Sequence, residues 1–147
     1  MDSANDPILN RAIYLAQRKC SVQSVMMLIL YDLRAPINYT GFEYLIKAVQ
    51  IAVNRGCTHI VAAELYEAVC AMCDSGVDAR SVEAAIRAVI RNAWKMRMDG
   101  MWNLYFPEYI VNRRKPPTNL EFITAIVYFV YLWQDCCGKE APCYASV

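Results

Sequence analysis

The chain has 147 residues, of which 57% are hydrophobic and 20% charged, so it can form one domain with a sizeable core. This composition excludes a disordered chain, because disordered segments carry too few apolar residues to bury a core. The N-terminus lacks a basic segment followed by an apolar stretch, so we expect no signal peptide and a cytoplasmic protein. The formal net charge of +1 excludes no class of partner.

In chain order, hydrophobic residues recur with the period of a helix, and no stretch alternates as a strand does. We therefore predict an all-α fold, a six-helix domain that contains a helix-turn-helix, plus a short N-terminal helix. The predicted helices span residues 7–19, 21–33, 41–55, 59–73, 79–98 and 118–134, with a short helical or turn-like stretch at 99–109. The predicted divisions are an N-terminal extension at 1–20, an effector-like domain at 21–135 and a tail at 136–147.

Capping residues set several of these boundaries. Thr40 is predicted to cap the third helix and Gly56 to stop it. Asp78, after a turn at residues 74–76, is predicted to cap the fifth helix. Thr118 and Glu121 fit a capping box at the start of the last helix.

The longest apolar run, residues 122–133, lies in that last helix. It is too short to span a bilayer, so we predict a buried core helix and no membrane partner.

The chain has seven cysteines and a single histidine, His59. Without an export signal, we expect reduced thiols that pack as small apolar side chains. Cys70 and Cys73 form a CxxC pattern within a helical segment, but a closed zinc site needs four ligands. We expect no metal and no cofactor, with a metal site or a redox pair at these two cysteines as the alternatives. The other cysteines are Cys20, Cys57, Cys136, Cys137 and Cys143.

Charge is polarised along the chain. Residues 80–115 hold eight basic and three acidic side chains, whereas residues 57–79 hold four acidic and no basic ones. On the fifth helix, at about 3.6 residues per turn, the apolar residues fall on one side and a basic line on the other. The members of that line are Arg80, Ala84, Arg87, Arg91 and Lys95. Arginine suits phosphate contact and the reading of guanine, so this helix is a candidate recognition helix in double-stranded DNA; an ordinary solvated helix face is the alternative.

Three sequence blocks, in order and at compatible spacing, resemble the effector domain of stage-zero sporulation protein A, the sporulation response regulator family. Residues 79–94 read Ala-Arg-Ser-Val-Glu-Ala-Ala-Ile-Arg-Ala-Val-Ile-Arg-Asn-Ala-Trp and resemble the family's recognition helix. Residues 40–45, Thr-Gly-Phe-Glu-Tyr-Leu, and 115–123, Lys-Pro-Pro-Thr-Asn-Leu-Glu-Phe-Ile, resemble two further blocks. The resemblance covers roughly residues 21–133.

The resemblance implies a transcription regulator that inserts this helix into the major groove of tandem operator repeats. A Glu and two Arg of the family's helix contact bases, and they fall on Glu83, Ala84 and Arg87 here, so one contact is lost. Ser81 and Ala88 depart from the family pattern as well, which predicts a different operator. The family's receiver domain needs more residues than precede the match, so we expect none.

The predicted base-proximal set is Arg80, Glu83, Ala84, Arg87 and Arg91, and the predicted phosphate contacts are Lys95, Arg113, Arg114, Lys115 and Asn119. Double-stranded DNA is the expected partner, and a homodimer on tandem sites is compatible with it. The alternative is a protein-interaction module, for example an antagonist, that keeps the fold without specific readout. No nucleophile motif or glycine-rich phosphate loop is present, so we expect neither an enzyme nor a small-molecule substrate.

Overall fold

The computed structural model describes residues 6–18, 20–73 and 76–139, and this part of the chain is helical without a strand. The all-α prediction is confirmed, with a short helix in front of six others. The elements are α1 (Pro7–Ala16), α2 (Val22–Asp32), α3 (Thr40–Asn54), α4 (Ala62–Ala71), α5 (Ala79–Lys95), the 3-10 turn η2 (Trp102–Leu104), α6 (Glu108–Val111) and α7 (Asn119–Lys139).

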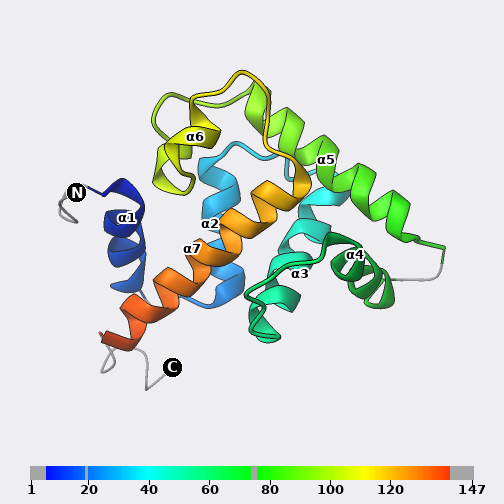
Figure 1. The fold of residues 1–147 in the computed structure, drawn as a ribbon, viewed down its shortest axis with the longest axis horizontal. Coiled ribbons are helices and arrows are strands. Elements are labelled where there is room, and N and C mark those ends of the chain that lie inside the picture. The colour runs from blue at the N-terminus through cyan, green and yellow to red at the C-terminus, as the bar shows by residue number, and fades with distance from the viewer. Residues whose placement is uncertain (1–5, 19, 74–75, 140–147) are drawn as a thin grey trace.

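The last helix, α7, crosses the middle of the molecule, and α1, α3 and α5 all pack against it (Figure 1). At the α5 side the core is aromatic: the Trp94 and Trp102 rings meet edge to face with their centroids 5.1 Å apart. The ring of Phe122 on α7 stands 5.8 Å from that of Trp102. Such rings bury large areas, so this cluster holds α5, η2 and α7 together.

Helix α1 is part of the same core. Ala12, Leu15 and Ala16 are buried, and α1 packs along α7. Arg11 also reaches a polar cluster below the surface, where its guanidinium lies 2.7 Å from the Asp32 carboxylate on α2 and 3.0 Å from the Tyr105 hydroxyl. That hydroxyl donates to Asp32, and burial together with this carboxylate raises the pKa of Tyr105.

Most predicted caps are confirmed. Asp78 accepts from the Ser81 amide at 2.8 Å, and Gly56, with φ of 64°, follows the end of α3 in the left-handed conformation that favours glycine. The predicted Thr40 cap is wrong. Thr40 is already helical, and the N-cap is Tyr39, whose side chain makes no capping hydrogen bond.

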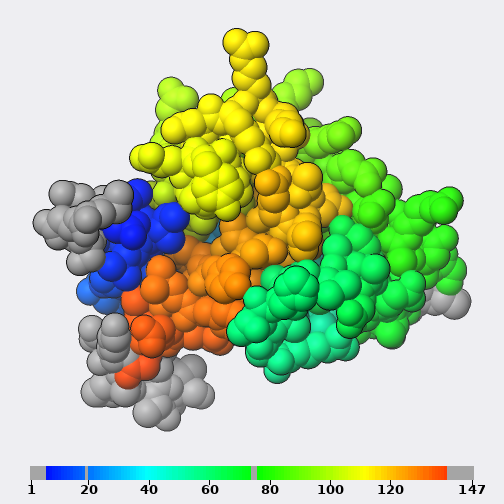
Figure 2. Space-filling model, viewed as in Figure 1, coloured from blue at the N-terminus to red at the C-terminus, as the bar shows by residue number. Residues whose placement is uncertain are grey.

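Helix α7 is longer than its predicted counterpart, and residues 136–139 of the expected tail are helical. Residues 119–138 would suit a membrane span by length and composition alone. Half of their most apolar window is buried in the fold, and a single such helix does not by itself indicate a span, because the core helix of a soluble protein meets the same criteria. In Figure 2 part of α7, in orange, stays at the surface between the blue α1 and the teal-green residues that lead into α4.

Gly41, in the first turn of α3, sits against the middle of α5. A Cβ at this position would lie 2.1 Å from the Ala85 carbonyl oxygen, a distance that no side chain tolerates. The close approach of α3 to α5 therefore requires glycine here, and it fixes how the predicted recognition helix is mounted on the core.

Candidate nucleic-acid interface

Helix α5 has two distinct faces. The buried face packs on α3, α4 and α7, and it consists of Val82, Ile86, Val89, Ile90, Ala93 and Trp94. The opposite face is exposed, and it consists of Arg80, Ala84, Arg87, Ala88, Arg91 and Lys95. Both faces agree with the prediction from helical periodicity. Because α4 precedes α5 and packs against it, the pair has the arrangement of a helix-turn-helix.

One ion pair lies on the exposed face of α5. The Arg87 guanidinium is 2.9 Å from the Glu83 carboxylate one turn before it, and both side chains are more than 40% exposed. An exposed i,i+4 pair of this kind contributes little to stability, so it can open at little cost when another partner arrives. Among the described residues, no carboxylate lies within ion-pair distance of Arg80, Arg91 or Lys95.

The connector between α6 and α7, residues 112–118, carries one basic side chain that is ion-paired and two that are exposed. Arg113 makes a two-pronged contact with Glu121, with one nitrogen–oxygen distance of 2.9 Å. This contact, together with the Thr118 amide, lowers the pKa of Glu121 to about 2. Arg113 is thus held in an ion pair with Glu121, and its predicted phosphate contact stays a prediction. Arg114 and Lys115 are exposed, and their predicted phosphate contacts stay predictions.

Asn119, another predicted phosphate contact, lies below the surface. Its side chain is 8% exposed, and its amide nitrogen donates to the Tyr66 hydroxyl at 3.1 Å and to the Glu83 carbonyl oxygen at 3.0 Å. Both hydrogens of the amide nitrogen are therefore engaged within the protein, and the predicted phosphate contact stays a prediction. The capping-box pattern places Asn119 in the first turn of α7, but no sequence signal shows which way it faces or that Tyr66 is its partner.

These elements enclose a groove of about 460 Å³ between α5 and the start of α7. Arg87 and Arg91 from α5 and Lys115 from the connector line it, together with one carboxylate, Glu83. The amino end of a helix also favours an anion, and α7 begins at this groove.

Of the predicted site, the groove brings together Glu83, Arg87, Arg91, Lys115 and the buried Asn119. Arg80, Ala84 and Lys95 lie outside it on the exposed face of α5, and Arg113 and Arg114 lie on the connector.

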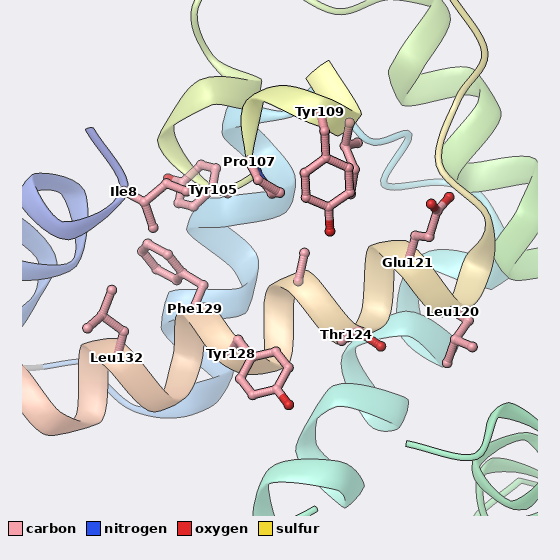
Figure 3. Close-up of a pocket in the computed structure, with 12 residues that line it drawn as sticks. Ile8, Tyr105, Pro107, Tyr109, Leu120, Glu121, Thr124, Tyr128, Phe129 and Leu132 are labelled. Atoms are coloured by element: carbon pink, nitrogen blue, oxygen red, sulfur yellow. The ribbon is translucent and has the colours of Figure 1, made fainter. Parts of the chain in front are cut away.

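A second groove, of about 440 Å³, follows α7 on the side of α1 and α6. In Figure 3 the Tyr109 ring stands over α7, and Phe129 reaches up from α7 toward Tyr105 and Ile8. Its lining is mainly apolar, and it contains no arginine or lysine. The two grooves therefore differ in kind, and the basic one alone suits a polyanion.

The alternatives of a metal site or a redox pair at Cys70 and Cys73 find no further ligand or disulfide among the described residues. No group of three or more His, Cys, Asp or Glu side chains there could hold a metal ion. The six described cysteines form no disulfide. Burial raises the pKa of the Cys70 thiol, and nearby Glu67 adds to this effect. His59 is exposed, and Cys143 lies outside the described residues.

Comparison with protein families assigns this architecture. The family model described as "Sporulation initiation factor Spo0A C terminal" matches residues 26–130, well over half of the chain. The chain belongs to this family. Comparisons with curated proteins and with solved structures gave no match. The Spo0A C-terminal family consists of DNA-binding effector domains that act in transcription regulation at sporulation, and it is not an enzyme family. The match includes the helix-turn-helix and the basic groove, whereas α1 precedes it.

Proposed function

We propose that this protein is a soluble, cytoplasmic transcription regulator that reads operator DNA with the exposed face of α5 in the major groove. The observation that carries the proposal is the division of α5 into a fully packed face and a solvent-facing face with three arginines and a lysine. A major groove admits one α-helix, and an arginine can donate to both acceptors of a guanine. Binding as a homodimer on tandem sites is part of the proposal.

The roles of the basic residues follow from their places. Arg87, at the middle of α5 and beside the groove, is the candidate for base contact, with Arg80, Glu83, Ala84 and Arg91 around it. Lys115 at the groove wall, Arg114 on the connector and Lys95 at the end of α5 are candidates for phosphate contact. Phosphate contacts hold the helix in register, and base contacts supply specificity.

The experiment selects a preferred duplex from a random library and then compares affinity for that duplex with affinity for random DNA at several salt concentrations. We expect Arg87→Ala to weaken binding to the selected site by about 1–3 kcal/mol more than binding to random DNA. Lys115→Ala should weaken both alike and reduce the salt slope by about one unit, because it removes one phosphate contact.

Arg18→Ala is the matched control. It removes one positive charge just beyond α1, which lies across the molecule from α5 (Figure 1). It should leave site preference unchanged. Failure to select any site would contradict specific readout, as would an equal loss on selected and random DNA from Arg87→Ala.

A second candidate function is a protein-interaction module or antagonist without specific readout. It is favoured by Ala84, which places a methyl group at the centre of the exposed face. That function predicts salt-dependent binding to any duplex, or none, together with normal folding.

A further inference from the structure

Asn119 lies where three walls of the basic groove meet. It is the first residue of α7, its amide nitrogen donates to Tyr66 on α4, and the same nitrogen donates to the main chain of α5 at Glu83. Tyr66 is 6% exposed. The hydrogen bond to Tyr66 is therefore buried and the one to Glu83 is partly buried, and losing a partner there costs more than in water.

The connector leading into Asn119 is fixed at several further points. Thr118 and Glu121 complete the capping box, with the Glu121 amide 3.1 Å from the Thr118 hydroxyl and the Thr118 amide 2.9 Å from the Glu121 carboxylate. Upstream, the Trp94 indole nitrogen on α5 donates to the Arg114 carbonyl oxygen at 3.3 Å. Lys115 thus stands on a segment that is tied to α5 on both sides.

We infer that Asn119 is a positioning residue: its two hydrogen bonds set the separation between α5 and the connector, so that Lys115 meets a DNA phosphate while α5 is in the groove. The inference rests on the proposed function. It assigns to Asn119 no contact with DNA, because its amide is occupied and buried.

The physical reason is preorganisation. A lysine side chain has many rotamers, and each degree of freedom that must be fixed on binding reduces the affinity gained. Because the backbone of Lys115 is already held against α5, only its side chain has to be ordered when DNA binds. Without the Asn119 bridge, the start of α7 can shift away from α5, and Lys115 no longer reaches a phosphate in the same complex.

A double-mutant cycle tests this coupling. The salt slope of binding to the selected duplex is measured for the native protein, Asn119→Ala, Lys115→Ala and the double variant. We expect Asn119→Ala to lower the slope by about one unit, as Lys115→Ala does, although it removes no charge. The double variant should lose no more than either single variant, because the two changes remove the same contact. Asn54→Ala, at the exposed end of α3, is the matched control and should leave the slope unchanged.

If Asn119 only stabilised the fold, its loss would not change the number of phosphates contacted and hence would not change the salt slope of DNA binding. If Lys115→Ala lowers the slope while a folded Asn119→Ala protein keeps it, the inference is overturned and the proposed function stands. Additive slopes, with about two units lost in the double variant, overturn it as well. If Lys115→Ala leaves the slope intact, the inference falls together with the phosphate contact of Lys115.

Should Asn119→Ala not fold, Tyr66→Phe takes its place in the cycle. This variant removes only the hydroxyl that accepts from Asn119 and keeps the buried ring. Coupling to Lys115→Ala is then expected in the same direction, and its absence overturns the inference.

Discussion

Ala84 is the small residue at the centre of the exposed face of α5. It lies one turn after Arg80 and about one turn before Arg87, and its side chain meets solvent. The neighbouring Ala85 is half-buried and belongs to the side that α3 approaches. On a helix seated in a major groove, the position of Ala84 faces the base edges, where a methyl group can touch only a thymine methyl.

Ala84→Arg is therefore expected to add a preference for guanine at one operator position, worth about 1–3 kcal/mol. The stability change should stay within about 0.5 kcal/mol, because the site is exposed and arginine is a good helix former. Site selection on both proteins checks the first expectation, and urea unfolding checks the second. Selection of one and the same sequence by both proteins would refute the assignment of residue 84 to the base edges.

At the scale of elements, the local sequence pattern predicted those features that neighbouring residues alone determine, namely helix faces and helix caps. The two faces of α5 follow from helical periodicity alone, and the capping box at Thr118 follows from a four-residue pattern. The start of α3 is different, since Gly41 must meet α5 there and the helix begins at Thr40 without a side-chain cap. The pairing of Arg113 with Glu121 and the burial of Asn119 depend on how the connector folds onto α5 and α7, which no local pattern encodes.

The amino end of α7 should respond to acid in a defined window. The folded-state pKa of Glu121, about 2, lies below its usual value of 4.5, so its carboxylate stabilises the fold above about pH 4.5. This contribution is lost as the pH falls from about 4.5 toward 2. Glu121→Gln should therefore be less stable than the native protein near neutral pH, and the difference should shrink through that window. Urea unfolding at a series of pH values measures it; a difference that is constant down to pH 2 would contradict the role of the Arg113–Glu121 pair.

At the scale of the whole molecule, α1 belongs to the same packed unit as the family's domain although it precedes the matched residues. The sequence predicted this helix as an extension, since its amphipathic pattern shows that one face is covered without showing by what. In the structure, α7 covers that face, and Arg11 ties α1 to α2 and to the segment after η2. Unfolding should therefore involve α1 and the rest of the protein together.

Arg11→Met is expected to lower the free energy of unfolding by about 1–3 kcal/mol, because it leaves the partly buried Asp32 carboxylate without its cation. Asp32→Asn in the Arg11→Met background should recover part of the loss. Urea unfolding gives the free energies, and hydrogen exchange at the buried residues of α1 shows whether this helix opens with the core. Exchange of α1 amides at a much lower free energy than the core would show that α1 opens by itself.

The contact at Gly41 has a consequence for how a lineage of such proteins can diversify. A codon change that places any other residue at 41 drives a side chain into the Ala85 carbonyl, so the mounting of α5 is closed to gradual change. Ala84 and Ala88 on the outer side of the same helix are exposed, so substitutions there leave the fold intact and, under the proposed readout, change the bases that are read. Under that proposal, one copy can drift to a new operator after a gene duplication by substitutions on this outer side. The contact at Gly41 would then stay constant within such a lineage, while the proposed regulatory targets change on the opposite side of α5.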